Sequence, residues 1–354
     1  MTGADDRPVL ITGGAGFIGS NLADRIAGEG RTVIVYDALS RAGVENNLAW
    51  LQSRHGGRIE AITADIRDED RLAAAATRAG AVFHLAAQVA VTTSLVDPRD
   101  DFAINILGTL NLLDALRTRN PNAPIVFAST NKVYGDLADI TFEMEGDRYV
   151  PADAQVRAYG IGETRPLDFH TPYGCSKGAA DQYVLDYARS YGLRAAVLRM
   201  SCIYGQRQMG TEDQGWVAHF LIRALEGKPI TLYGDGRQVR DILDVSDAVD
   251  AYVAAWSRID AVTGCAFNLG GGPGNAVSLR ELLAYVGQLL GRELDIGFSD
   301  WRAGDQRYFV ADTRAAEQAL GLGSKIGWQQ GVERLARWLA EARGLPLTSS
   351  RQVA

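Results

Sequence analysis

The sequence is poor in cysteine and histidine, and each shortage excludes a kind of site. Its 354 residues include three cysteines, an odd number without a C-x-x-C pair, so we expect no disulfide framework. We expect buried, small apolar residues in a reducing compartment at Cys175, Cys202 and Cys265. The four histidines lack the spacing of metal ligands, and we expect them to be packing or surface residues without a metal. They are His55, His84, His170 and His219.

The chain also lacks long basic runs and long apolar segments. Its formal net charge of −7 argues against a nucleic-acid or membrane-surface partner. No segment approaches the length of a membrane span, and residues 1–10 carry acids where a signal peptide would have basic and then apolar residues. We therefore expect a cytoplasmic protein that holds any anionic ligand with a few local charges.

Hydrophobic residues make up 47% of the chain, which is enough for the core of one large unit or of two interlocked domains. Short β-branched runs alternate with helical patterns, and continuous apolar runs of this kind are typical of strands buried on both faces. The predicted strands cover residues 8–12, 32–37, 59–65, 81–87, 124–129 and 194–200. Because the spacing leaves room for a helix after each strand, the pattern predicts an α/β fold with a doubly wound parallel sheet.

The alternation of predicted strands and helices becomes irregular after the sixth predicted strand. Glycine-rich loops occur there beside one amphipathic stretch, residues 279–291, whose leucines and valine share a helical face. This part of the chain predicts a smaller C-terminal α/β lobe packed beside the sheet. The last residues have little to bury, so we expect a frayed tail over 346–354.

A glycine-rich turn joins the first predicted strand to the next helix. In "TGGAGFIGS", the glycines Gly13, Gly16 and Gly19 permit a tight turn, close approach to a pyrophosphate and close packing of helix on sheet. The second strand ends in Asp37, at the distance of about 20 residues expected for an acid that holds the adenosine ribose. The turn therefore predicts a Rossmann domain that binds NAD, since a carboxylate there would repel the 2′-phosphate of NADP.

Further cofactor contacts are expected in this turn and where the next strands end. They are Phe17, Ile18, Asp65, Ile66, Ala86 and Ala87, the alanines being small enough for the backbone to approach the dinucleotide. We place the NAD-binding domain at 1–198, with contributions from about 235–255, and the substrate-binding lobe mainly at 199–345.

A serine-threonine turn and a tyrosine-lysine pair lie farther along the chain. Tyr173 and Lys177 are four residues apart, which places both on one helical face beside the cofactor. The lysine ammonium and an oxidised nicotinamide would lower the pKa of the phenol from its usual value of about 10, so that Tyr173 could take an alcohol proton. Thr130 or Ser129 would hydrogen-bond the same hydroxyl. Behind a nucleotide-binding turn, this set predicts hydride transfer between an alcohol and NAD.

These motifs resemble a known family. "TGGAGFIG", "STNKVYG", Tyr173-x-x-x-Lys177, "RDILDVSD" and "RAGD" are similar to the extended short-chain dehydrogenase/reductases that include the nucleotide-sugar epimerases and dehydratases, over about residues 8–340. The resemblance implies a nucleoside diphosphate sugar between the lobes, with Thr130, Tyr173 and Lys177 as the catalytic set. It also implies substrate contacts from Gln88, Asn131, Cys202, Arg207, Gln208, Arg240 and Arg302.

The two residues after Thr130 bear on the reaction. Dehydratases of the family have an Asp-Glu pair there, which protonates the leaving hydroxyl and takes the neighbouring proton, whereas this chain has Asn131 and Lys132. Neither an amide nor an ammonium can serve as the base for that elimination. The resemblance therefore favours an epimerase over a 4,6-dehydratase.

Longer stretches narrow the resemblance. "STNKVYGD", "LDFHTPYGCSKGAADQYVLDYARSYGL", "YGQRQMGTEDQGWV" and "GRQVRDILDV" look like the CDP-paratose 2-epimerases, also called CDP-tyvelose epimerases. This implies a CDP-hexose or CDP-3,6-dideoxyhexose inverted at C2 through a ketone. A C4 epimerase of a UDP-hexose, a nucleotide-sugar dehydrogenase or reductase, and a catalytically silent NAD-binding regulator stay open as alternatives.

Two helical segments carry more apolar residues than one core needs. One is residues 105–116, and the other follows Tyr173 and presents near one face Ala179, Ala180, Tyr183, Val184 and Tyr187. Relatives pair these two helices, so the resemblance implies a homodimer or a dimer of dimers.

Overall fold

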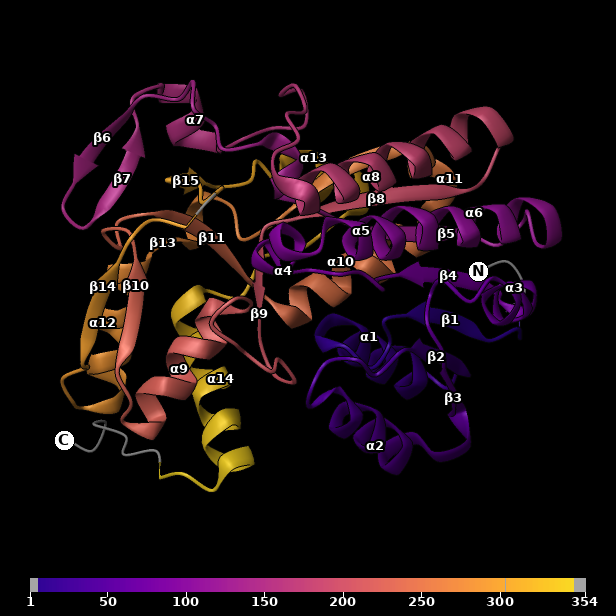
Figure 1. The fold of residues 1–354 in the computed structure, drawn as a ribbon, viewed down its shortest axis with the longest axis horizontal. Helices are drawn as coiled ribbons and strands as arrows, with labels where there is room; N and C mark the ends of the chain where they lie inside the picture. Colours follow the sequence, from indigo (N-terminus) through magenta and orange to yellow (C-terminus); the bar gives the residue numbers. More distant parts are fainter. Residues whose placement is uncertain (1–5, 303, 347–354) are drawn as a thin grey trace.

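The computed structural model describes residues 6–302 and 304–346 and is built around a seven-stranded sheet (Figure 1). Its order is β3-β2-β1-β4-β5-β8-β12, and all neighbouring strands are parallel. The strands are β1 (Val9–Thr12), β2 (Val33–Asp37), β3 (Ile59–Thr63), β4 (Ala81–His84), β5 (Ile125–Thr130), β8 (Ala195–Met200) and β12 (Cys265–Leu269). The predicted doubly wound sheet is confirmed. Its order reverses between β1 and β4, where such sheets bind their ligands.

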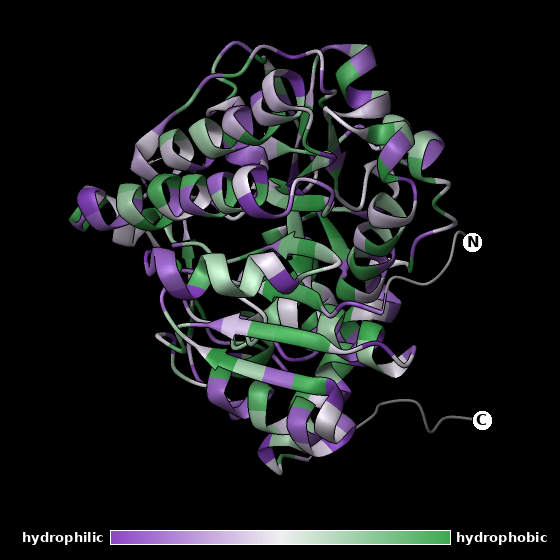
Figure 2. Cartoon of the chain, turned by 90° about the vertical axis from the view of Figure 1, so that its right-hand side faces the viewer, coloured by the Kyte–Doolittle hydropathy of each residue, from purple (hydrophilic) through white to green (hydrophobic). Residues whose placement is uncertain are grey.

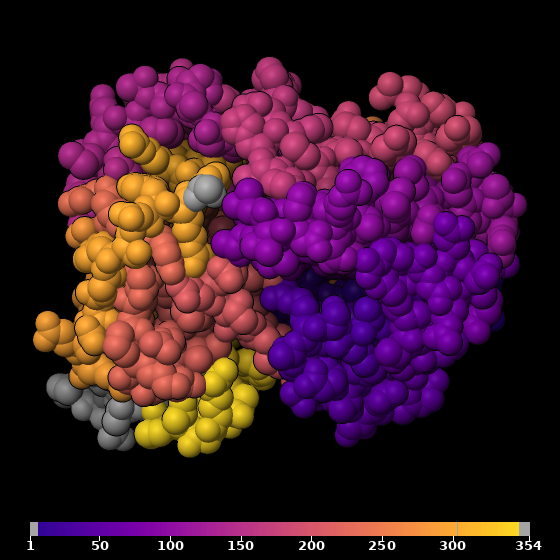
Figure 3. Space-filling view, viewed as in Figure 1, coloured from indigo at the N-terminus to yellow at the C-terminus, as the bar shows by residue number. Residues whose placement is uncertain are grey.

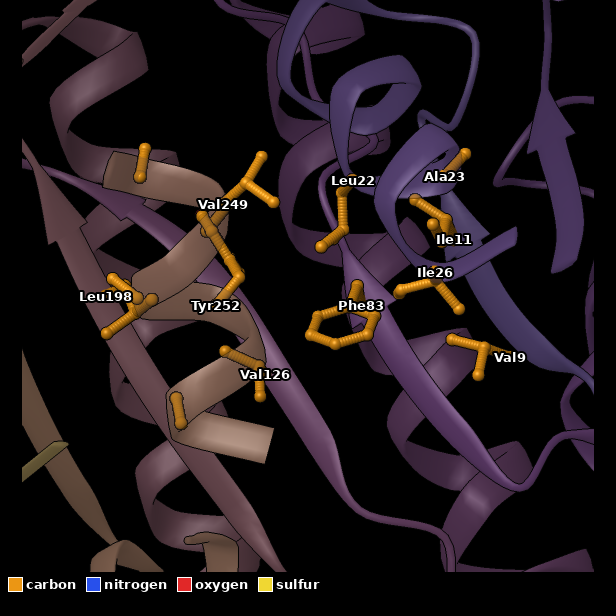
Figure 4. Packing of buried hydrophobic residues seen from close by; sticks show 14 of the residues in the cluster. Val9, Ile11, Leu22, Ala23, Ile26, Phe83, Val126, Leu198, Val249 and Tyr252 are labelled. Atoms are coloured by element: carbon orange, nitrogen blue, oxygen red, sulfur yellow. The ribbon is translucent and has the colours of Figure 1, made fainter. Parts of the chain in front are cut away.

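Helices cover both faces of this sheet, which is why its strands are continuous apolar runs. One face carries α1 (Phe17–Gly28), α2 (Val44–His55) and α10 (Val245–Ser257), and the other carries α3 (Glu69–Arg78), α6 (Gly108–Arg119) and α8 (Thr171–Tyr191). Figure 2 shows the apolar residues gathered in the strands, and Figure 4 shows Phe83 of β4 packed between α1 and α10. Its ring meets that of Tyr252 edge-on, with the ring centroids 6.2 Å apart.

Short elements join these strands and helices. They are η1 (Gly56–Arg58), α4 (Val91–Val96), α5 (Pro98–Phe102), η2 (Ala103–Leu107), η3 (Asn131–Tyr134), the hairpin β6 (Phe142–Glu145) and β7 (Arg148–Pro151), α7 (Ala154–Tyr159) and α11 (Ile259–Val262). Among them, the β6–β7 hairpin and α7 pack against the smaller lobe described next (Figure 1). No helix among the residues described is both long and apolar enough to cross a membrane.

The smaller C-terminal lobe has its own core. Strand β11 (Val239–Asp244) pairs with β9 (Cys202–Tyr204), β13 (Ala276–Ser278) and β15 (Tyr308–Phe309), and β10 (Ile230–Tyr233) pairs with β14 (Ile296–Ser299). The helices of this lobe are α9 (Trp216–Glu226), α12 (Leu279–Leu290) and α14 (Trp328–Arg343), whereas α13 (Arg314–Leu320) packs against β12 and α10 of the sheet. The helix predicted at 279–291 is confirmed as α12. Ser278 and Glu281 form a capping box at its start, and Gly291 ends it at a φ of +62°.

The seventh strand bears on the expected division of the chain. β12 comes from residues that the sequence placed mainly in the other lobe, and β11, from the stretch of about 235–255 expected to contribute to the NAD-binding domain, pairs with strands of the smaller lobe. A parallel strand needs a crossover connection, and α10 provides it. We therefore propose that residues 245–269 belong to the sheet domain. The tail expected over 346–354 lies, beyond residue 346, outside the described residues, as do residues 1–5.

The cysteine prediction is wrong in one respect. Cys175 is exposed and the other two cysteines are only partly buried. Cys175 lies on α8 between the buried residues Gly174 and Ser176, and its own side chain is exposed. For the histidines, packing is confirmed at His84, which is fully buried and hydrogen-bonded to the hydroxyls of Thr12 at 2.7 Å and Thr109 at 2.9 Å.

Candidate active site

A cleft of about 510 Å³ opens at the carboxyl ends of β1, β2, β4 and β5 and reaches the start of α9. Figure 3 shows the surface hollowed where the indigo N-terminal segment, the purple segment near residue 100 and the salmon segment after residue 200 meet. The predicted residues that line this cleft are Gly13, Gly16, Phe17, Ile18, Gly19, Asp37, Asp65, Ile66, Ala86, Ala87, Thr130, Tyr173, Cys202 and Gln208. The two lobes therefore share one site.

The glycine turn leaves no room for side chains. Gly13 has a φ of +70°, and a Cβ added there would lie 2.7 Å from the amide nitrogen of Ala86. A Cβ on Gly19 would lie 2.2 Å from the carbonyl oxygen of Gly13. The turn therefore places the start of α1 and its free amides directly against the cleft, as a dinucleotide pyrophosphate requires. These residues fit NAD.

Asp37 holds the glycine turn as well as facing the cleft. Its Oδ2 accepts a hydrogen bond from the amide of Ala15 at 3.0 Å, and its Oδ1 accepts one from the amide of Leu39 at 2.9 Å. The carboxylate is thus fixed at the end of β2, where the sequence predicted an acceptor for the ribose hydroxyls.

Replacing Asp37 by alanine should weaken NAD binding by about 10-fold or more and narrow the preference over NADP, since both an acceptor for the ribose and a charge that repels the 2′-phosphate are lost. Titration of both cofactors measures the change. Asp37→Asn is the matched comparison, because its single amide oxygen keeps an acceptor for one of the two backbone amides while the charge is removed. An unchanged preference in Asp37→Ala would show that another residue reads the ribose.

An arginine missed by the sequence reasoning also lines the cleft. Arg67 pairs with Asp65 at 2.6 Å and with Asp100 at 2.7 Å, and this guanidinium lowers the pKa of the Asp65 carboxyl. Its position after the third strand could have indicated it. Ser201 and Trp216 were missed as well, because only the folded chain brings the end of β8 and the start of α9 to the cleft.

The three predicted catalytic residues are brought together by β5 and α8. Thr130 ends β5 and Tyr173 lies in the first turn of α8, and the Thr130 hydroxyl lies close enough to the phenol to lower its pKa. Lys177 lies one turn farther along α8, behind the cleft lining, with its Nζ 4.2 Å from the centroid of the Phe127 ring. All three side chains are buried.

Burial opposes charge on both members of the tyrosine-lysine pair. It raises the pKa of Tyr173 to about 12, against the effect of the Thr130 hydroxyl, and lowers the pKa of Lys177 to about 7, against the carboxylates of Asp181 and Asp101. Among the protein's own groups, desolvation therefore outweighs the Thr130 hydroxyl at Tyr173. The lowering of this pKa expected from Lys177 together with an oxidised nicotinamide stays a prediction for the NAD-bound site. NAD, when bound, would supply a hydride acceptor and a positive charge beside the phenol.

Ser129 and Thr130 have different roles. The hydroxyl of Ser129 donates to Asp181 at 2.7 Å, and this carboxylate is also bound by both arms of Arg199 at 2.9 and 3.0 Å. Ser129 is thus held in a buried ion-pair network. Of the two hydroxyls that the sequence left open, Thr130 is the one that meets Tyr173.

Two predicted substrate contacts are engaged elsewhere. The guanidinium of Arg207 lies 3.7 Å from the centroid of the Trp50 ring and 5.5 Å from that of Trp338, so it joins α2 to α14. Gln88 folds back on its own loop, where its Nε2 donates to the carbonyl of Ala90 at 2.8 Å. Neither side chain lines the cleft, and nothing in the spacing of the sequence indicated these partners.

The remaining predicted contacts do not line the cleft: Arg240 and Arg302 belong to the smaller lobe, and Asn131 lies in the turn after β5. Arg240 is buried and pairs with Asp305 at 2.6 Å, and Asn131 donates to Gln306 at 3.1 Å. Arg302 lies 3.8 Å from the centroid of the Tyr233 ring. The structure therefore places the two arginines on one side of the cleft but not in its lining.

Comparisons with known proteins agree with this geometry. Residues 9–270 match the model of the NAD dependent epimerase/dehydratase family. The chain is 44% identical over 339 residues to the CDP-paratose 2-epimerase of Salmonella typhi, covering 93% of this chain and 98% of that protein. Among solved structures it is similar to the UDP-glucose 4-epimerase of Thermotoga maritima with UDP-glucose, at a TM-score of 0.81 and 29% identity, covering 95% of this chain and 99% of that one. It is also similar to the UDP-glucose 4-epimerase of Thermus thermophilus in complex with NAD, at a TM-score of 0.79 and 33% identity, with the same coverage of 95% and 99%.

Proposed function

Because the chain belongs to the NAD-dependent epimerase/dehydratase family, we propose that it inverts C2 of a CDP-linked hexose or 3,6-dideoxyhexose. The enzyme is an NAD-dependent nucleotide-sugar epimerase. The observation that carries the finer assignment is the 44% identity to a CDP-paratose 2-epimerase over 93% of the chain. The absence of an acid pair after Thr130 supports it, since a dehydratase needs a base at that position.

The chemistry at C2 explains why the site has this set of residues. A hydrogen on a carbon beside the acetal centre is too weakly acidic for a side chain to remove as a proton. Oxidation of the C2 hydroxyl to a ketone, rotation of the ketone and reduction of its other face would invert the carbon without net redox. In this proposal Tyr173 takes and returns the hydroxyl proton, Thr130 orients the hydroxyl and Lys177 supports the phenolate.

The direct test is to incubate the protein with CDP-, UDP- and GDP-hexoses and to follow the C2 and C4 protons by NMR. We expect inversion at C2 with the CDP-sugar. Inversion at C4 of the UDP-sugar would establish the second candidate, which the similarity to two UDP-glucose 4-epimerase structures supports. Accumulation of reduced cofactor in proportion to product would instead identify a dehydrogenase.

We further propose a homodimer, formed by a surface that includes part of the two helices indicated by the sequence and extends onto α4 and α5. On α8, three of the five residues expected at an interface pack into the core instead, because they face the sheet: Ala180, Val184 and Tyr187. A group of exposed apolar side chains lies on α4, α5, η2 and α8 and includes Leu95, Val96, Phe102, Leu107 and Tyr183. Because α4 and α5 pack on α8, these residues form one surface.

The wild-type protein should sediment as a dimer, or a multiple of it, at micromolar concentration. Phe102→Glu should shift it toward monomer, because Phe102 is 49% exposed within this surface and a buried unpaired charge opposes association. Met144→Glu is the control, since Met144 is 70% exposed but lies on β6. A monomeric wild type would contradict the proposal.

A further inference from the structure

The two residues that stand in place of the acid pair both reach across to the smaller lobe. The Nζ of Lys132 donates to the carbonyl of Gly304 at 3.1 Å, and the Nδ2 of Asn131 donates to Oε1 of Gln306 at 3.1 Å. We call Arg302 and residues 304–306 the strap. It lies between β14 and β15 of the smaller lobe, so these two bonds tie that lobe to the turn that carries Thr130.

The strap is held from the smaller lobe as well. Arg240 donates through Nη2 to Oδ1 of Asp305 at 2.6 Å and to the carbonyl of Gln306 at 2.6 Å. At its other end, Arg302 lies over the Tyr233 ring and donates to the carbonyl of Glu212 at 2.9 Å. The strap thus carries a guanidinium at one end and is fixed to the catalytic turn at the other.

The strap also touches the helix that presents the catalytic tyrosine. A Cβ added to Gly304 would lie 2.9 Å from Cγ2 of Thr171, and Gly304 has a φ of +70°. Thr171 begins α8 and lies two residues before Tyr173. A displacement of the strap would therefore change its contacts with both the turn that carries Thr130 and the start of α8.

The charges around Lys132 indicate that its ammonium is held in one place. It is half-buried, and the guanidinium of Arg240 opposes its charge while the carboxylates of Asp305 and Asp136 favour it. Burial and Arg240 together lower the pKa of Lys132 to about 8. A lysine free to move would turn its ammonium to solvent and away from the arginine, whereas this one donates to the Gly304 carbonyl.

We propose that Lys132 is a positioning residue that fastens the strap over the catalytic turn and so sets how Arg302 meets the substrate. The proposal rests on the proposed function only for the identity of the nucleotide sugar. Asn131 and Lys132 stand where a dehydratase has its acid pair, and the proposal assigns a role to Lys132.

The test compares Lys132→Met, which keeps the length of the stem without the ammonium, with Lys132→Arg, which keeps a donor and the charge. Lys132→Met should raise KM for the nucleotide sugar by about 10-fold or more with kcat nearly unchanged, the usual effect of losing a charge-assisted hydrogen bond that acts on binding. Hydrogen exchange of the amides at 304–306 should quicken in the NAD-loaded protein, and Lys132→Arg should restore both quantities. Lys228→Met, an exposed lysine paired with Glu226 at 2.8 Å, is the control.

The exchange measurement needs no sugar, so a wrong substrate assignment would leave that part of the test intact. Unchanged exchange with a fall in kcat alone would mean that Lys132 acts on the reacting atoms, and would overturn the proposal. Unchanged exchange and unchanged KM would overturn it equally. If methionine prevents folding, Lys132→Gln supplies a shorter neutral side chain, for which the same shifts in KM and exchange are expected.

Discussion

Tyr173→Phe should lower turnover by a factor of about 10² or more while the fold and the NAD content stay as in the wild type, because this range is typical for the loss of a general acid–base group. The phenol is buried in the cleft and its hydroxyl contacts Thr130, so the substitution removes one oxygen and leaves the ring in place. The Thr130 hydroxyl keeps a partner, since it accepts from the amide of Lys132 at 3.2 Å. The loss of stability should therefore be about 1 kcal/mol or less.

Three measurements check this result: steady-state turnover, the nicotinamide content of the purified protein and thermal unfolding. Tyr191→Phe is the matched control, because Tyr191 ends the same helix and is 53% exposed. It should leave turnover unchanged. Near wild-type activity in Tyr173→Phe would show that another group is the general acid–base.

The cofactor half of the site could be predicted from the sequence because its signals are local. The glycine turn, the strand before it and Asp37 lie within residues 9–37, and the structure places all of them at one edge of the sheet. The spacing of Tyr173 and Lys177 likewise gives one helical face without knowledge of the fold.

The parts that the sequence missed depend on long-range contacts or on orientation. The bond between Lys132 and Gly304 joins residues 172 positions apart, and no periodicity shows it. Ser129 was a candidate equal to Thr130 until Asp181 appeared beside its hydroxyl. Arg207 looked like a ligand-binding arginine, but two tryptophans from different helices lie against it. Composition does not reveal which face of a helix is covered, which is why Cys175 was misplaced.

Deuterium placed at C2 of the substrate gives the clearest expected outcome, because it should be either almost fully retained or almost fully lost in the product. In the proposed reaction, the hydrogen leaves C2 as a hydride and returns to the other face of the same carbon. A hydrogen transferred as hydride between carbon atoms would not exchange with water, whereas the hydroxyl proton handled by Tyr173 would. The label therefore separates hydride return from direct deprotonation, which would wash deuterium into the solvent.

The measurement is NMR of a CDP-hexose deuterated at C2 during turnover in ordinary water. The account predicts the C2 epimer with deuterium retained at C2 and no solvent proton at that carbon. Loss of deuterium into water as the epimer forms would contradict hydride return, and with it the roles given to Thr130, Tyr173 and Lys177.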